Sequence, residues 1–187
     1  MSNATAETKA ASQVMEHGGA TPIDAASHFR SKLVVETDPS DVYDDLRNGE
    51  QSFVVVDTRS KEAYSKAHIP TAMNMPHRNI TKESTAAWPK DKLLVLYCFS
   101  PACNAAAKAA VKLTALGFTV REMIGGIEYW EHDGYPLQRE GEPRVALTTQ
   151  YWGSSFGPAI ARQGEGTGSR GPLVVRTGTD GRKYREL

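Results

Sequence analysis

The sequence predicts an α/β fold, in which the strands of a mostly parallel sheet alternate with helices. Two observations support this class. The segments 53–56 and 93–97 are short, continuous apolar runs, which are typical of strands buried on both faces of a covered parallel sheet. A helix-like segment with its own start or stop signal follows each run, as expected for strands joined by right-handed crossovers.

The first two helices are predicted from their start signals. Thr21-Pro22 places an N-cap residue before a proline at the first helical position, and Asp38-Pro39 repeats this pair of signals. Gly49 is placed to end the second helix. Between the two helices, the apolar triplet Leu33–Val35 is expected to form a brief strand.

The same alternation continues through the rest of the predicted domain. The run 93–97 is the strongest strand signal, and the alanine-rich segment after it stops at Gly117, which is typical of a helix C-terminus. The expected strands lie at 53–56, 72–75, 93–97 and 119–124, and the expected helices lie at 60–67, at 105–116 and around Ile127, Tyr129 and Trp130.

Composition divides the chain into three parts. Residues 1–20 hold too few large apolar groups to offset the entropy of ordering, so a mobile N-terminal arm is expected before a domain at 21–140. Residues 141–187 hold nine of the sixteen glycines and are expected to form a tail. Within it, Asp180-Gly181 predicts a hairpin over 173–187. This tail is also the candidate contact for a protein partner.

Charge and composition exclude several classes of function. The chain carries 22 basic and 22 acidic side chains, so its charge gives no general attraction to nucleic acid or to a membrane. No apolar run approaches the roughly 18 residues of a membrane span, and no signal-peptide order is present, so a cytoplasmic protein is expected. Two cysteines cannot form a disulfide framework, and in a reducing compartment such thiols are buried or reactive.

The chemistry concentrates at Cys98, which directly follows a buried strand and precedes a short loop and a helix. In open α/β sheets, ligands bind beyond the carboxyl ends of strands, where the free N–H groups of the next helix also point. These groups stabilise anions, so the pKa of the Cys98 thiol is expected to fall from about 8.5 to about 6 or 7. Cys98 is therefore a candidate nucleophile, and its alternative is an inert buried thiol.

Three separated parts of the sequence carry a family resemblance. The first comprises Val55–Arg59, Glu62–Tyr64 and His68–Asn74. The second is Cys98 at the end of its strand. The third comprises Gly125–Ile127, Trp130 and Gly134–Leu137. In this order and spacing they resemble a single-domain rhodanese from Val54 through Leu137, with Cys98 where that family places its sulfur-accepting cysteine.

The resemblance implies a five-stranded parallel sheet flanked by helices on both faces and a sulfurtransferase that needs no cofactor. Cys98 would take sulfane sulfur from a small-molecule donor as a persulfide and pass it to a thiol or to cyanide. Asp57 and Arg59 would support the loop or its neighbouring helices through charge-assisted hydrogen bonds. The backbone N–H groups that would hold the persulfide belong to the loop Phe99, Ser100, Pro101, Ala102, Cys103 and Asn104.

The loop departs from the family pattern at two positions. Rhodanese loops commonly place arginine directly after the cysteine and again five residues on, where this chain has Phe99 and Cys103. A less cationic loop should bind the doubly charged thiosulfate weakly, so polysulfides and persulfides stay open as donors. Ala67 and Thr71 stand where the family often has glycine, which predicts a modestly reshaped turn.

Two alternative functions follow from the same residues, and two other kinds of site are not expected. Cys103 permits a thiol–disulfide redox cycle with Cys98, or it is a small residue at a helix start. The absence of both arginines also suits a non-catalytic rhodanese module that binds a protein partner. A phosphatase or arsenate reductase is not expected, because Asn104 stands where those loops need arginine. The five histidines lack ligand spacing, so no metal site is expected.

Overall fold

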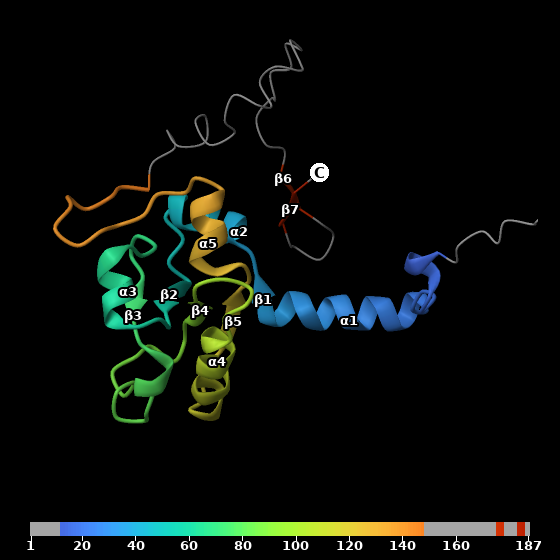
Figure 1. Ribbon diagram of the computed structural model, residues 1–187, viewed down its shortest axis with the longest axis horizontal. Coiled ribbons are helices and arrows are strands. Elements are labelled where there is room, and N and C mark those ends of the chain that lie inside the picture. Colours follow the sequence, from blue (N-terminus) through green and yellow to red (C-terminus); the bar gives the residue numbers. More distant parts are fainter. Residues whose placement is uncertain (1–11, 148–174, 178–182, 186–187) are drawn as a thin grey trace, which may run out of the picture. The chain divides into compact units, whose positions relative to one another are not determined.

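Five strands form one sheet in the computed structural model, which describes residues 12–147, 175–177 and 183–185 (Figure 1). Their order is β1-β5-β4-β2-β3, and every neighbouring pair is parallel. The predicted fold class is therefore confirmed. The strands are β1 (Glu36–Thr37), β2 (Phe53–Asp57), β3 (Met73–Asn74), β4 (Leu93–Tyr97) and β5 (Val120–Met123).

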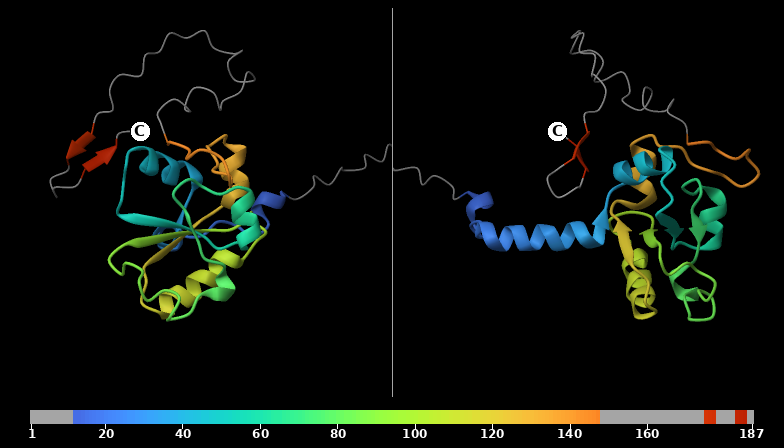
Figure 2. Two further views of the ribbon diagram at one scale, coloured as in Figure 1. Left: turned by 90° about the vertical axis from the view of Figure 1, so that its left-hand side faces the viewer. Right: turned by 180° about the vertical axis from the view of Figure 1, so that it is seen from behind.

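Helices cover both faces of this sheet. Figures 1 and 2 show α2 and α5 on one face and α4 on the other. The helices are α1 (Pro22–Val35), α2 (Pro39–Arg47), α3 (Lys61–Lys66), α4 (Ala105–Ala115) and α5 (Gly126–His132), and the short 3-10 turns are η1 (Gln13–Met15) and η2 (His77–Asn79). None of the helices in the described residues is long and apolar enough to cross a lipid bilayer.

The central strand β4 divides the hydrophobic core into two clusters. Successive side chains of a strand point to opposite faces, so Val95 and Tyr97 pack with α2 and α5 around Trp130. Leu96 and Cys98 point to the other face and pack with α4. The side chain of Cys98 therefore lies on the face of the sheet that α4 covers.

Local capping explains where the helices begin. The side chains of three N-cap residues accept hydrogen bonds from backbone N–H groups in the first turn, which stabilises each helix start. These N-caps are Thr21 of α1, Asp38 of α2 and Ser60 of α3. Gly117 follows α4 with a φ of 81°, a conformation that glycine adopts without steric cost.

The strand predicted at Leu33–Val35 is wrong, because the structure continues α1 through this triplet. Leu33 lies one helical turn after Phe29, and no proline or glycine interrupts the helix before Pro39. Valine costs at most about 0.7 kcal/mol more than alanine in a helix, which is too little to end α1 here. The edge strand β1 starts at Glu36, where it pairs with Glu122 of β5.

Thr71, in the turn before β3, has a φ of 73°. A β-branched residue rarely adopts this left-handed conformation, so a glycine would suit the position better. The turn carries Ile69, which is fully buried in the cluster around Trp130.

The chain divides into two compact units, Met1–Ser155 and Phe156–Leu187. The sheet belongs to the first unit. In the second unit, β6 (Val175–Thr177) and β7 (Lys183–Arg185) pair antiparallel, with Arg176 opposite Tyr184. Residues 1–11 of the predicted N-terminal arm and residues 148–174, 178–182 and 186–187 of the predicted tail lie outside the described residues.

Candidate active site

Cys98 lies at the carboxyl edge of the sheet, directly after β4. The loop 99–104 follows it, and α4 begins at Ala105. Parallel strands expose their carboxyl ends on one edge, and the first N–H groups of α4 lack partners within the helix. The sequence thus places the only cysteine-containing loop where a sheet edge and a helix start meet.

The two cysteines are joined by a disulfide bond in the structure. Their Cα atoms lie 6.3 Å apart, within the range of about 4.4 to 6.8 Å that a disulfide requires. The sequence left open whether Cys103 could reach Cys98, and the structure shows that it does. Cys98 is 3% exposed and Cys103 is partly buried, so the structure shows the oxidised pair and not a free, accessible thiolate.

Two of the six loop residues cannot donate a backbone N–H to a ligand. Pro101 has no N–H, and Cys103 donates its own to the carbonyl of Ser100 at 3.0 Å. This bond closes a turn between the cysteines. The remaining backbone donors of the loop belong to Phe99, Ser100, Ala102 and Asn104.

The start of α5 fixes the first half of the loop. The N–H of Ile127 donates to the carbonyl of Cys98 at 3.0 Å, and that of Glu128 donates to the carbonyl of Phe99 at 2.9 Å. Gly126 makes this approach possible, because a Cβ atom there would lie 2.6 Å from the carbonyl oxygen of Cys98. Two main-chain bonds therefore hold the cysteine and its neighbour against α5.

A buried ion pair lies beneath the loop. Arg59 donates to both carboxylate oxygens of Asp57, with Nε 2.9 Å from Oδ1 and Nη2 2.6 Å from Oδ2. The guanidinium also donates to the carbonyl of Ala67 at 2.7 Å. Its Cζ atom lies 4.9 Å from the ring centre of Phe99, which suits a cation–π contact. Arg59 thus contacts Phe99, the residue that follows Cys98.

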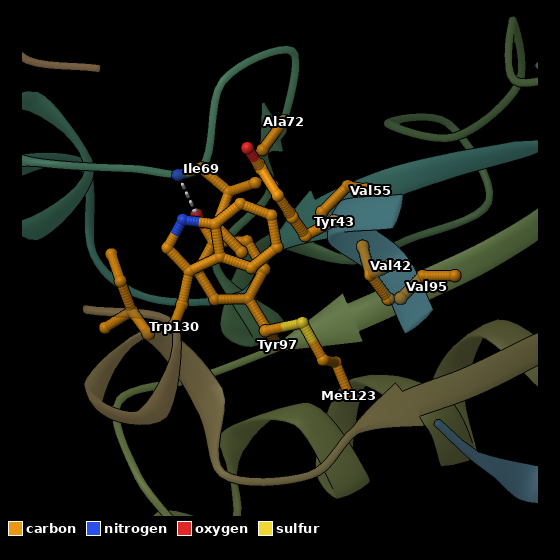
Figure 3. Close-up of a cluster of buried hydrophobic side chains, with 10 residues drawn as sticks. Val42, Tyr43, Val55, Ile69, Ala72, Val95, Tyr97, Met123 and Trp130 are labelled. Carbon is orange, nitrogen blue, oxygen red and sulfur yellow. Dashed lines mark hydrogen bonds between the residues drawn. The ribbon is translucent and has the colours of Figure 1, made fainter. Parts of the chain in front are cut away.

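Tyr97 connects this ion pair to the strand that carries Cys98. Its hydroxyl donates to Oδ2 of Asp57 at 2.7 Å and accepts the N–H of Ile69 at 3.2 Å. Figure 3 shows the ring inside the hydrophobic cluster, with the bond from Ile69 as a dashed line. Burial and the adjacent Asp57 carboxylate raise the pKa of the Tyr97 hydroxyl well above its usual value, so it stays protonated as a donor.

Thr58 holds the main chain at the same point. Its N–H and its Oγ1 both donate to the carbonyl of Tyr97, at 3.0 and 2.8 Å. The residue before the cysteine is therefore fixed through its hydroxyl, its ring and its carbonyl.

The surface beside the loop is apolar and acidic. A groove of about 550 Å³ borders the loop at Pro101, and the half-exposed Ile124 and Tyr129 form part of its wall. Three carboxylates and one ammonium group complete the charged lining: Glu36, Asp38, Asp133 and Lys32. Burial and the neighbouring Glu36 raise the pKa of Glu122, which pairs with Glu36 across strands β1 and β5.

Three residues of this site escaped the sequence-based prediction as site residues. Tyr97 looked like the last apolar residue of a strand, although its position next to the cysteine was a usable signal. Thr58 lies between the two polar residues Asp57 and Arg59 that were singled out. Gly126 was noted only as part of the family resemblance, because a close approach between two loops has no local signature.

Residues 38–133 match the family of rhodanese-like domains. The thiosulfate sulfurtransferase GlpE of Pseudomonas syringae pv. syringae is 34% identical over 82 residues, which cover 43% of this chain and 74% of that relative. The matched segment of the family includes the whole loop and both residues of the buried ion pair.

Solved structures share the fold. The BH2092 protein of Bacillus halodurans is 41% identical with a TM-score of 0.63, over 68% of this chain and 93% of that one. The rhodanese-like domain of the Alr3790 protein from Anabaena is 26% identical with a TM-score of 0.52, over 59% and 83%. A full-length protein from Lactobacillus plantarum, 22% identical with a TM-score of 0.55 over 63% and 98%, shows the same fold alone.

Proposed function

This chain belongs to the family of rhodanese-like domains, and from this membership we propose that it is a sulfurtransferase whose sulfur carrier is Cys98. The observation that carries the proposal is the place of Cys98, at the end of the central strand and just before the N-terminus of α4. Loop N–H groups and the helix terminus both favour a negative charge there.

The reduced chain is the form that accepts sulfur, because the disulfide occupies the sulfur of Cys98. The Cys98 thiolate attacks the sulfane sulfur of a donor, and the remainder of the donor leaves with the electron pair of the broken bond. A thiol acceptor or cyanide then attacks the outer sulfur of the persulfide, and Cys98 leaves as the thiolate. The cycle has no net oxidation or reduction.

The loop donors hold the negative charge during both steps. The N–H groups of Ser100, Ala102 and Asn104 can bind the outer sulfur, and the α5 bonds keep the carbonyl of Cys98 away from it. The buried Asp57–Arg59 pair keeps the strand end rigid beneath the loop. Such a rigid backbone needs little reorganisation when the charge moves from sulfur to sulfur.

Charge near the loop disfavours thiosulfate as a donor. The nearby guanidinium of Arg59 is neutralised by Asp57, and the groove beside Pro101 carries three carboxylates against one ammonium group. Thiosulfate carries two negative charges beside its sulfane sulfur, so this lining repels it more strongly than the singly charged reactive end of a polysulfide or a small-thiol persulfide. The donor class that we propose is therefore polysulfide or persulfide.

A donor panel tests the proposal. Reduced wild type, Cys98→Ser and Cys103→Ser are assayed with cyanide as acceptor and with thiosulfate, polysulfide or glutathione persulfide as donor. With the persulfide-type donors, we expect the wild type and Cys103→Ser to form thiocyanate faster than the protein-free reaction, and Cys98→Ser to add nothing to that rate. If the folded, reduced wild type turns over no donor, the chain is instead a non-catalytic module that binds a partner.

A further inference from the structure

The transfer of sulfur through Cys98 makes no use of Cys103, yet the structure joins the two sulfurs. We propose that Cys103 is a resolving residue, which attacks the Cys98 persulfide, releases hydrosulfide and leaves the disulfide that the structure contains. The inference rests on the proposed function, because it needs a persulfide on Cys98. It adds a second fate for the bound sulfur, reductive release instead of transfer.

Geometry allows this attack without unfolding the site. In the structure, Sγ of Cys103 is bonded to Sγ of Cys98. This Sγ of Cys98 is the inner sulfur of the proposed persulfide, so the fold already places the attacking sulfur in contact with the sulfur that it attacks. Both cysteines pack with the cluster on the α4 side of the sheet. Hydrogen bonds from α5 hold the loop at Cys98, and the turn between Ser100 and Cys103 brings Cys103 back toward Cys98.

The step balances in atoms and electrons. The Cys103 thiolate attacks the Sγ of Cys98, and the bond between this Sγ and the outer sulfur breaks. The outer sulfur leaves with the electron pair and takes up the proton that Cys103 lost, as hydrosulfide. The sulfane sulfur is reduced by two electrons, and the two cysteine sulfurs together are oxidised by two.

Hydrosulfide is a good leaving group for this exchange. Its conjugate acid is more acidic than an alkyl thiol, and thiol–disulfide exchange is faster when the leaving sulfur is the weaker base. Burial of Cys98 also limits the access of external thiols to the persulfide, whereas Cys103 is already in contact. Resolution by Cys103 therefore competes with transfer to an acceptor in solution.

A dithiol reductant completes the cycle. Its first thiolate attacks the Sγ of Cys103, since Cys103 is partly exposed while Cys98 is buried. Cys98 leaves as the thiolate at the N-terminus of α4, where its charge is stabilised. The second thiol of the reductant then resolves the mixed disulfide, so each turn consumes one dithiol and returns both cysteines to the thiol form.

A single-turnover experiment under argon tests the proposal. Fully reduced wild type, Cys103→Ser and Cys98→Ser are mixed with one equivalent of glutathione persulfide, whose leaving group is a thiol and not sulfide. Sulfide is measured with time, and the intact protein mass is recorded after an acid quench. Thermal melting of each variant confirms that it is folded, and Cys103→Ala serves as a second replacement that lacks a hydroxyl.

We expect the wild type to release close to one equivalent of sulfide and to lose two hydrogens in mass. Cys103→Ser and Cys103→Ala should keep one extra sulfur and release no early sulfide. A wild type that holds its persulfide as long as Cys103→Ser, with Cys103 still a thiol, would overturn the inference and leave the sulfurtransferase intact. Cys103 variants that gain no sulfur, together with a wild type that releases no sulfide, would instead overturn the proposed function.

Discussion

The hydroxyl of Tyr97 donates to Oδ2 of Asp57 at 2.7 Å, which ties the residue before the cysteine to a buried ion pair. The same carboxylate accepts hydrogen bonds from Nε and Nη2 of Arg59, whose guanidinium lies over the ring of Phe99. The residues on either side of Cys98 thus share one polar network. We infer that this network fixes Cys98, the proposed sulfur carrier, at the edge of the sheet.

Removing the Tyr97 hydroxyl should weaken this network. Tyr97→Phe leaves Oδ2 of Asp57 short of one donor and the buried N–H of Ile69 without an acceptor. We expect the free energy of unfolding to fall by about 2 kcal/mol, measured by urea denaturation of the reduced protein. Tyr64→Phe is the matched control, because its hydroxyl makes one bond to the carbonyl of Ala72 in a partly buried place. Equal losses in both variants would contradict the role given to Tyr97.

A methyl group at Gly126 should displace the cysteine loop. In Gly126→Ala, Cβ would meet the carbonyl of Cys98 at 2.6 Å, at a φ of 63°. We expect slower sulfur loading of the protein and a loss of more than about 2 kcal/mol in stability. Gly49→Ala is the matched control, because Gly49 has a φ of 78° and a Cβ there would meet no atom within 4 Å. It measures the backbone cost alone, about 1 kcal/mol, without a steric clash. Unchanged loading in Gly126→Ala would show that α5 does not position the loop.

A cation in the loop should shift donor preference. In Phe99→Arg, the half-exposed side chain is replaced by a guanidinium beside the cysteine. We expect kcat/KM for thiosulfate to rise about tenfold relative to that for glutathione persulfide, because thiosulfate carries two charges beside its sulfane sulfur and gains more from the added guanidinium. Phe99→Leu separates this effect from loss of the aromatic ring. If the ratio of the two kcat/KM values changes equally in Phe99→Arg and Phe99→Leu, charge does not set the donor class.

Stability at neutral pH should respond to Glu122. Burial, followed by repulsion from Glu36, raises its pKa in the folded protein above the ordinary value of 4.5. A raised pKa means that the folded state binds the proton more tightly, so this contribution to stability is present below 4.5 and is lost as pH rises through the raised value. We therefore expect Glu122→Gln to be more stable than the wild type near neutral pH, by less than about 1 kcal/mol.

The measurement for Glu122 is urea unfolding at several pH values. The gain in Glu122→Gln should shrink below the ordinary pKa of glutamate, where the wild-type side chain is already protonated. Glu131→Gln, on the exposed side of α5, is the control and should show little difference. A gain that does not change with pH would contradict the assigned cause.

Much of the fold could be predicted because its signals are local. Capping pairs such as Thr21-Pro22 and Asp38-Pro39 act within one helical turn. The runs around 53–56 and 93–97 are recognised as apolar from their own residues, without knowledge of the strands that pair with them. The triplet Leu33–Val35 was misassigned because its state depends on continuation of α1 and on the register of β1 with β5. Neither is visible in a short window of sequence.

The site could be predicted only in part for the same reason. Cys98 was identifiable from the strand before it and the loop after it. The bond from Tyr97 to Asp57 and the approach of Gly126 to the cysteine carbonyl join segments about 30 to 40 residues apart, so no local pattern reports them. Whether Cys103 reaches Cys98 depended on the path of the loop, which spacing alone left open.

The central claim is that Cys98 of the reduced protein takes up one sulfane sulfur. It is tested most directly by intact-mass and peptide-level mass spectrometry of Cys103→Ser after brief exposure to a persulfide donor, since resolution by Cys103 is absent in this variant. The account predicts a gain of one sulfur, located on Cys98 and removed by cyanide as thiocyanate. A folded, reduced variant that gains no sulfur, or gains it at another residue, would contradict the account.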